Sequence, residues 1–178
     1  MDIVCRNEFQ PEELQTMRRY SRIITYKPAI KELWFRKDFL ADEETMAYNH
    51  AFGGTISFPE EKWSLWYDRW LNDPEGKHYY RYLMDEASGD FVGEIACHLD
   101  EGSNRWMADI IIAAWCRGKG YGRKGLQLLC REARSFGIEE LYDDIAIDNT
   151  AVRLFISEGF EEVGRTADCI ILRKHLKE

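Results

Sequence analysis

Three glycines at alternate positions, Gly118, Gly120 and Gly122, separate an apolar run from an amphipathic segment. The run before them, residues 108–115, predicts a strand, and the segment after them has apolar residues at helical spacing until Gly137, a typical helix stop. Alternate glycines let a backbone approach a ligand closely, and the helix start behind them adds partial positive charge. The turn also carries basic side chains, namely Arg117, Lys119, Arg123 and Lys124. This stretch is therefore predicted to bind a phosphorylated ligand.

The first part of the chain is predicted to be mainly helical. Residues 11–24 begin with a proline and two glutamates, as the first turn of a helix does, whereas residues 31–40 alternate like a strand. A short helix is expected over residues 42–48, and a better-marked one follows the capping pattern of residues 57–60. Its aromatic stripe is Trp63, Trp66, Tyr67 and Trp70. Such rings either pack in the hydrophobic core or line a substrate pocket. Trp66 is the candidate for the pocket.

Strands dominate the second part of the chain. Three predicted strands, at residues 78–84, 91–99 and 106–115, are joined by tight turns, which implies an antiparallel meander. After the central helix come a strand, a helix capped by the Asp148-Asn149 pair and a final hairpin, at residues 141–147, 149–158 and 160–174. The expected fold class is α/β, with a mixed, mostly antiparallel central sheet flanked by helices.

Composition bounds the class of protein. A chain of 178 residues is expected to form one domain, with residues 1–30 as a helical extension that either caps the domain or pairs with a second copy, which makes a homodimer possible. A net charge of −8 argues against nucleic-acid binding, and no apolar run approaches the length of a membrane span. The five cysteines are scattered and the first residues do not resemble a signal peptide, so a reducing, cytoplasmic location is expected.

Three phosphate-binding motifs compete for the glycine turn. A Walker A loop needs a hydroxyl residue after its lysine, but Lys119 is followed by glycine. A dinucleotide fingerprint fits Gly120, Gly122 and Gly125, yet too little chain follows for the repeated units of a doubly wound sheet. The third pattern, Arg-x-x-Gly-x-Gly, is met by Arg117, Gly120 and Gly122.

At this third pattern the sequence resembles the GNAT family of acetyl-CoA-dependent N-acetyltransferases. A second block, residues 149–160, is similar to the family's helix that runs from an asparagine to a Gly-Phe pair, and residues 91–95 are similar to the strand before the core. The resemblance covers residues 31–176 and implies the GNAT, or acyl-CoA N-acyltransferase, fold. It also implies acetyl-CoA as the acetyl donor and direct transfer of the acetyl group to a primary amine of a small molecule or peptide.

The resemblance implies which residues bind the cofactor. Backbone amides of the turn would hold the pyrophosphate, and the preceding strand would pair with the pantetheine arm. Asn149 would bond the arm or the thiol end, and Arg153 would add a phosphate contact. The full set is Ile111, Ile112, Ala113, Arg117, Gly118, Lys119, Gly120, Tyr121, Gly122, Arg123, Asn149, Arg153 and Phe155. No metal is expected, because the four histidines show no ligand spacing with each other or with the cysteines.

The chemistry is less completely specified. Amine acetylation needs a base for the ammonium proton, and Glu94 and Asp109 are the candidates, because both lie on strands that should border the cleft. Asp143 and Asp144 are further carboxylates that we expect to hold a cationic acceptor, such as a polyamine or aminoglycoside; a peptide N-terminus fits nearly as well.

The family's usual thiolate-protonating tyrosine is replaced by Phe155, which leaves the acid unassigned. A thiol of pKa about 8.5 leaves tolerably as an anion, or Tyr142, Tyr121 or a water donates the proton. The alternative to an enzyme is a non-catalytic CoA-binding or regulatory module.

Overall fold

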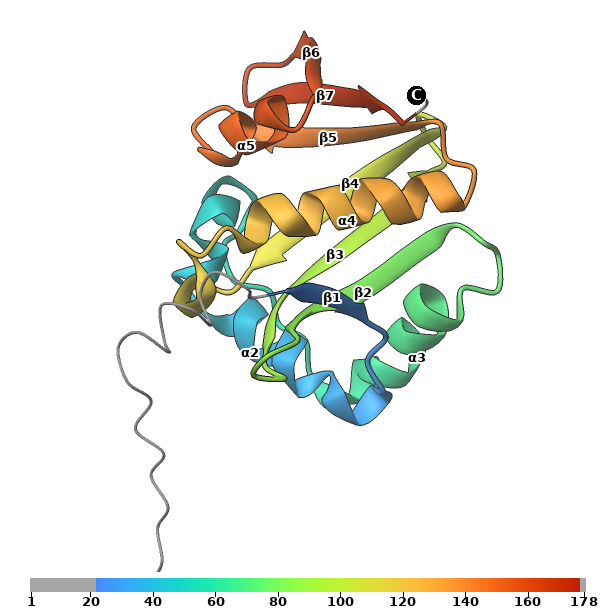
Figure 1. The fold of residues 1–178 in the computed structure, drawn as a ribbon, viewed down its shortest axis with the longest axis vertical. Helices are drawn as coiled ribbons and strands as arrows, with labels where there is room; N and C mark the ends of the chain where they lie inside the picture. Colours follow the sequence, from blue (N-terminus) through green and yellow to red (C-terminus); the bar gives the residue numbers. More distant parts are fainter. Residues whose placement is uncertain (1–21, 177–178) are drawn as a thin grey trace, which may run out of the picture.

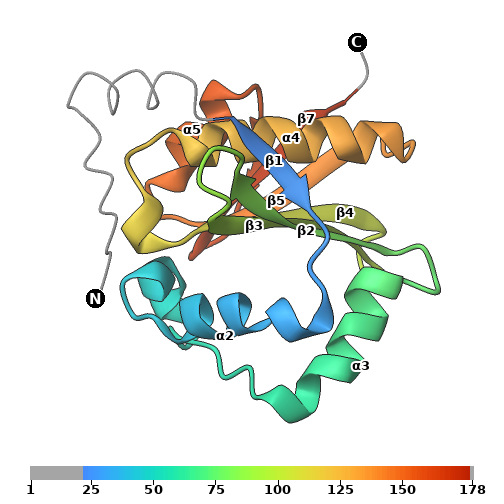
Figure 2. The ribbon, with the colours of Figure 1, turned by 60° about the horizontal axis from the view of Figure 1, so that its bottom comes forward.

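The computed structural model describes residues 22–176, which form one seven-stranded sheet between two layers of helices. The strand order is β1-β2-β3-β4-β5-β7-β6. Helices α4 and α5 cover one face, and α2 and α3 lie against the other (Figures 1 and 2). The strands are β1 (Ile23–Tyr26), β2 (His78–Asp85), β3 (Phe91–Asp100), β4 (Arg105–Ile112), β5 (Glu140–Ala146), β6 (Glu161–Arg165) and β7 (Cys169–His175). The predicted mixed, mostly antiparallel sheet is confirmed.

The first four strands form the predicted antiparallel meander, with one strand that the sequence analysis missed. β1 pairs with β2, β2 with β3 and β3 with β4, all antiparallel. Strand β1 occupies the end of the segment predicted as a helix over residues 11–24, so that prediction is wrong at Ile23 and Ile24. The earlier part of that helix, and residues 1–21 of the predicted extension, lie outside the described residues.

The segment predicted as a strand over residues 31–40 is helical, which corrects the sequence analysis. A turn, η1 (Ile30–Glu32), leads into α2 (Trp34–Ala41). Its buried residues are Leu33, Phe35, Phe39 and Leu40, and the Phe35–Phe39 spacing places both rings on one helical face, with centroids 5.2 Å apart. Packing of this face against Tyr82 and Phe91 of the sheet, at centroid distances of 5.2 and 5.5 Å, outweighs the strand-like alternation.

Short helical segments connect α2 to β2. They are η2 (Thr45–Phe52), η3 (Glu60–Lys62), α3 (Trp63–Tyr67) and η4 (Asp68–Asn72). Asp42 accepts a hydrogen bond from the Thr45 amide at 2.7 Å, so it holds the turn that the sequence predicted it to cap. The helix after Ser57 begins at Pro59 without a side-chain cap, so the predicted capping box does not form.

Helix α4 (Tyr121–Ser135) packs very closely against the sheet. Strand β4 ends at Ile112 rather than at the predicted Trp115, and a short helical turn, η5 (Ala114–Cys116), lies between it and α4. A Cβ atom added at Gly125 would lie 2.6 Å from Leu83 Cδ1 and 2.9 Å from Ile110 Cδ1, so only glycine allows this approach. Gly125 therefore serves packing, and the close fit sets where the start of α4 lies relative to β4.

The last third of the chain forms the far side of the sheet. Helix α5 (Ala151–Ser157) follows β5, and β7 pairs antiparallel with both β5 and β6. The Asn149 Oδ1 atom accepts a hydrogen bond from the Ala151 amide at 2.9 Å and so starts α5 as predicted. Phe155 and Phe160 pack edge to face in the core, with centroids 4.9 Å apart. None of the described helices is long and apolar enough to cross a membrane.

Candidate functional site

The central feature of the site is a gap between β4 and β5. These neighbouring strands are parallel and meet at a single pair of residues, Met107 and Tyr142. Beyond this pair they diverge toward the side on which α5 lies (Figure 1). Along the opposite edge of β4 the pairing with β3 is continuous, from Arg105 to Ile112. The last half of β4 therefore has one paired edge and one open edge.

Backbone groups of β4 face the open edge at alternate residues. The Ala113 amide bonds to the Val92 carbonyl at 3.0 Å, so Ala113 and Ile111 direct their backbone groups toward β3. Ile112 then directs its own toward the gap, and the Arg117 Nε atom reaches its carbonyl at 3.3 Å. Of the segment predicted to pair with a pantetheine arm, Ile112 faces the gap, whereas the backbone groups of Ile111 and Ala113 are used by β3.

The glycine turn and the start of α4 close one end of the gap. Gly118 and Gly120 adopt φ angles of 77° and 79°, which disfavour other residues, and a Cβ atom at either would project into open space. The first amides of α4 have no acceptor inside the helix and carry its partial positive charge. The turn therefore forms a cradle suited to an anion, and a side chain at Gly120 would enter it.

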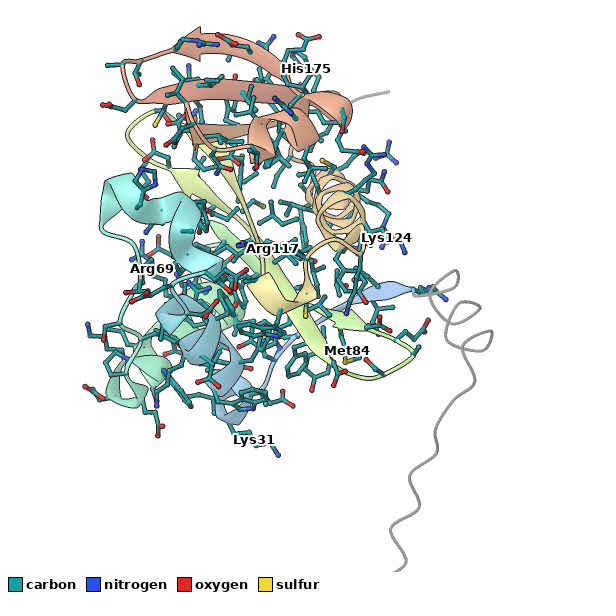
Figure 3. All side chains as sticks on the ribbon, turned by 90° about the vertical axis from the view of Figure 1, so that its left-hand side faces the viewer. Lys31, Arg69, Met84, Arg117, Lys124 and His175 are labelled. Atoms are coloured by element: carbon teal, nitrogen blue, oxygen red, sulfur yellow. The ribbon has the colours of Figure 1, made fainter. Side chains whose placement is uncertain are left out.

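Two arginines of the cradle are held by protein groups. Arg117 lies where the start of α4 meets η2 (Figure 3), and its Nη1 and Nη2 atoms donate to the Glu44 and Thr45 carbonyls at 3.1 and 2.8 Å. Arg123 pairs with Glu158, with 2.9 Å between Nε and Oε1. These contacts fix the cradle to η2 and to the end of α5, so the positive charge beside the turn is already positioned.

The gap opens into a large cleft with a volume of about 1130 Å³. It is lined from the cradle, from both diverging strands and from the helices of the opposite face. All the predicted site residues line it except Ala113, Lys119 and Arg153; Lys119 and Arg153 are exposed. The structure thus brings together Trp66, Glu94, Asp109, Ile111, Ile112, Arg117, Gly118, Gly120, Tyr121, Gly122, Arg123, Asp143, Asp144, Asn149 and Phe155.

Glu94 is buried in a network that the sequence analysis did not foresee. Its two carboxylate oxygens accept hydrogen bonds from Arg36 Nη1 and from the Tyr80 hydroxyl. The Arg36 guanidinium in turn lies 4.7 Å from the centroid of the Trp66 ring. The Glu94 side chain is only 4% exposed. Because both oxygens are engaged, Glu94 holds Arg36 and the aromatic wall in place rather than presenting a free carboxylate.

The other three carboxylates of the cleft form a separate group. Asp109 is half exposed, and its Oδ2 atom lies 3.4 Å from His98 Nδ1. Asp143 and Asp144 follow the Met107–Tyr142 contact on β5. Burial, together with the charges of Asp109 and Asp144, raises the pKa of Asp143 well above its usual range. This group therefore combines an accessible acid, Asp109, with a partly buried one, Asp143, whose ionised form is disfavoured.

The tyrosines proposed as proton donors are engaged elsewhere. The Tyr121 hydroxyl donates to Asp85 Oδ2 at 2.5 Å in the core. The Tyr142 hydroxyl donates to Glu140 Oε2 at 2.8 Å and does not line the cleft. The cleft residues that the sequence analysis missed, Arg36, Tyr48, Tyr80 and His98, come from four different elements. None carries a local motif, although Arg36 would have been found if residues 31–40 had been assigned to a helix.

Comparison with known proteins identifies the family. The model of the acetyltransferase (GNAT) family matches residues 34–160. The chain belongs to the GNAT family. This confirms the resemblance drawn from Arg117, Gly120, Gly122 and the block at residues 149–160. Compared by sequence with curated proteins, the chain has no significant match.

Solved structures support the GNAT fold. Spermidine N-acetyltransferase from Vibrio cholerae, in complex with CoA and spermine, superposes with a TM-score of 0.69 at 19% identity, covering 86% of this chain and 95% of that one. Ribosomal-protein-alanine N-acetyltransferase from Brucella melitensis gives 0.66 at 22% identity, over 85% and 99%. The protein yncA from Salmonella typhimurium, solved with its cofactor acetyl-CoA, gives 0.63 at 20% identity, over 89% and 96%.

The residues present fit acetyl-CoA, the cofactor of this GNAT chain. The open cradle at Gly118 and Gly120 suits its pyrophosphate, and the gap-facing backbone of Ile112 suits its amide-bearing arm. Bound there, acetyl-CoA supplies the activated acetyl group. Among residues 22–176, no group of three or more His, Cys, Asp or Glu side chains is placed to hold a metal ion.

Proposed function

We propose that this protein transfers an acetyl group from acetyl-CoA directly to a primary amine of a small molecule or a peptide. The observation that carries the proposal is the cleft through the β4–β5 gap. At one end the glycine cradle suits an anion, and at the other Asp109 and Asp144 suit a cation. The two substrates are thereby directed to the same gap from opposite sides of the sheet.

We assign the base to Asp109. The alternative, Glu94, accepts hydrogen bonds from Arg36 and Tyr80 with both of its oxygens. Asp109 is half exposed and lies beside His98, so it can take a proton from a substrate ammonium directly or through one water. The carboxylate must act before attack, because only the neutral amine is a nucleophile.

The acceptor side combines charge with aromatic surface. Asp144 is exposed on β5, and Trp66 lies on the opposite wall with its ring stacked 6.0 Å from that of Trp70. Aromatic faces and carboxylates both attract ammonium groups. A polyamine, an aminoglycoside or a peptide N-terminus meets these requirements, and a structural neighbour, the Vibrio cholerae spermidine N-acetyltransferase, was solved with spermine.

One assay tests the proposal. The protein is incubated with acetyl-CoA and a panel of primary amines, and release of free thiol is followed together with the mass of each acetylated product. Thiol release that depends on one class of amine, and a product mass increased by one acetyl group, are expected. Saturable acetyl-CoA binding without thiol release for any amine would instead support a non-catalytic CoA-binding module, for which the replacement by Phe155 is the supporting observation.

A further inference from the structure

The cleft has no free tyrosine at the positions expected to donate a proton to sulfur. Phe155 occupies the position of the usual donor and is buried against Phe160. The hydroxyls of Tyr121 and Tyr142 donate to Asp85 and to Glu140. A departing thiolate at the gap must therefore leave without protonation or take a proton from another group.

Asp143 lies where such a group is required. It is the first residue of β5 beyond the single contact between Met107 and Tyr142, so it stands at the apex of the gap. Strand alternation places it with the buried residues Leu141 and Ile145, on the face that α4 covers. Asp144 points to the other face, where α2 and α3 lie.

The register of β4 supports this assignment of faces. Ile110 contacts the α4 side, since its Cδ1 atom lies within 2.9 Å of a Cβ added at Gly125. Met107, three residues earlier, therefore faces the opposite side, and Tyr142 pairs with it there. Asp143 thus shares the α4 side of the sheet with Phe155, and both line the cleft.

The surroundings of Asp143 favour the protonated form of its carboxyl group. The side chain is partly buried in the cleft wall, and the charges acting on it are those of Asp109 on β4 and Asp144 on β5. Two more acidic groups interact with it, Tyr48 on η2 and Cys169 on β7. All of these are neutral or negative, so each favours the uncharged carboxyl, which is a proton donor; the backbone hydrogen bond at Asp144 acts in the opposite direction and is the smallest of the effects.

We propose that Asp143 is the catalytic acid that protonates the departing sulfur, in place of the missing tyrosine. The assignment rests on the proposed acetyltransferase function. It follows from the position of the carboxyl at the apex of the gap, on the cofactor side of the sheet, and from the absence of another free donor among the predicted tyrosines.

The proton balance closes within the pair Asp109 and Asp143. A bond forms between the amine nitrogen and the acetyl carbon, and the carbon–sulfur bond breaks, with its electron pair going to sulfur. Asp109 first passes the ammonium proton on to water; after attack it takes one further proton from nitrogen, and Asp143 gives one to sulfur. Transfer of a proton from Asp109 to Asp143 through water in the cleft restores both groups. A neutral amine and a thioester thus yield an amide and a thiol.

Tyr48 is the rival donor, because it also lines the cleft. Burial and the charges of Glu94, Asp109 and Asp143 raise its pKa far above that of free tyrosine. A donor is most effective when its pKa is near the working pH. Tyr48 is therefore a weaker acid than an ordinary tyrosine, and Tyr48→Phe is expected to lower kcat less than Asp143→Leu does.

The protonation of Asp143 is tested without turnover. Infrared spectra of the cofactor-free protein at pH 7 are compared with those of Asp143→Asn and of Asp168→Asn, a matched change at an exposed turn between β6 and β7. A protonated-carboxyl band should be present in the wild type and in Asp168→Asn and absent from Asp143→Asn. Equal spectra for all three would overturn the proposal.

The role in turnover is tested by kinetics. Asp143→Asn and Asp143→Leu should lower kcat about 10²-fold, near the low end for a lost acid because a thiolate leaves tolerably. The affinity of both variants for acetyl-CoA, measured by titration calorimetry, should stay within about twofold of wild type, because Asp143 acts on the leaving group and not on cofactor binding. Asp143→Glu should recover part of the loss, and Asp168→Asn should behave as wild type.

The pH dependence separates an acid from a base. If Asp143 were the base, a high pH would deprotonate the amine in solution and restore the activity of the Asp143 variants. If Asp143 is the acid, a high pH supplies no proton to sulfur, and the variants stay slow. A deficit that disappears at high pH, a kcat for Asp143→Leu close to wild type, or a larger loss in Tyr48→Phe overturns the assignment. Acetyl-CoA binding by a wild type that acetylates no amine contradicts the proposed function itself, which distinguishes the two failures.

Discussion

Two acidic residues of the cleft, Glu94 and Asp143, are stabilised in different ways. Glu94 is buried but satisfied, because Arg36 and Tyr80 donate to its oxygens. Asp143 is partly buried beside other acids, which disfavours its ionised form. The first arrangement stabilises a charge and fixes the aromatic wall. The second stores a proton at the gap and destabilises the folded protein when that proton is lost.

The stability of the protein should therefore depend on pH through Asp143. The pKa of Asp143 is raised in the folded state. Its contribution to folding stability is therefore fully present below its unfolded pKa of about 3.9 and is lost as the pH rises through its folded pKa. Asp143→Asn cannot ionise, and its amide can donate to the neighbouring carboxylates. The variant should match the wild type near pH 4 and melt higher at pH 8 by more than about 2–4 °C, which is the change that about 1 kcal/mol produces in a chain of this length. Thermal melts of both proteins across this range give the comparison; parallel curves would argue that Asp143 is ionised in the folded state.

Removal of Arg36 should destabilise the protein strongly. Arg36→Met leaves the Glu94 carboxylate buried without its cation, and breaking a buried pair in this way costs about 3 kcal/mol or more. Urea denaturation of the single variant measures the loss. The double variant Arg36→Met with Glu94→Leu is the control, because it removes the buried charge as well and should recover much of the stability. A loss below about 1 kcal/mol for the single variant would show that the pair is not structurally important.

At the scale of secondary-structure elements, sequence reasoning succeeded where the signal is local. The glycine turn could be predicted because its backbone conformation favours glycine, which the sequence shows directly. Gly118 and Gly120 adopt φ angles of 77° and 79°. The meander was predicted because turns of a few residues allow only antiparallel neighbours. The start of α5 was predicted because Asn149 caps the helix with its own side chain. Each of these features depends on residues within a few positions of one another.

Long-range features escaped the sequence for the same physical reason. The alternation of Leu33 and Phe35 predicts a strand where α2 lies, although packing against the sheet decides its conformation. The network of Arg36, Tyr80 and Glu94 joins α2, β2 and β3, and the pKa of Asp143 depends on a residue of β4. No local pattern encodes such contacts, so the sequence offers Glu94 beside Asp109 as a candidate base and does not show that it is a buried ion-pair partner.

The cradle makes its own prediction at this scale. Gly120→Glu should abolish CoA binding without unfolding the protein, because the side chain would enter the cradle with a like charge to the pyrophosphate. Gly137→Glu is the matched control, because Gly137 has the same φ of 79° and no atom within 4 Å of an added Cβ, but lies after α4. Both should lose about 1–2 kcal/mol from left-handed backbone strain. Titration calorimetry with CoA should detect binding only in the control; binding by folded Gly120→Glu would place the pyrophosphate elsewhere.

At the scale of the whole molecule, the sheet consists of two parts joined at one residue pair. Strands β1 to β4 form one part and β5, β7 and β6 the other, and β4 meets β5 only at Met107 and Tyr142. Helix α4 packs on the first part, and its start contacts α5. A Cβ atom added at Gly122 would lie 3.2 Å from Leu154 Cδ2 of α5. A ligand in the gap would contact both parts and oppose their separation.

Acetyl-CoA should consequently stabilise the whole fold, because it binds only when both walls of the gap are assembled. At a concentration 100 times its dissociation constant, the expected gain is about 2.7 kcal/mol, or roughly 5–10 °C in Tm for a chain of this length. Thermal melts at increasing acetyl-CoA concentration should show one transition that moves upward as a whole. Gly120→Glu should show no shift, whereas Gly137→Glu should shift as the wild type does. Two separate transitions, only one of them responding to acetyl-CoA, would mean that the two parts of the sheet unfold independently and that the ligand is held by one wall alone.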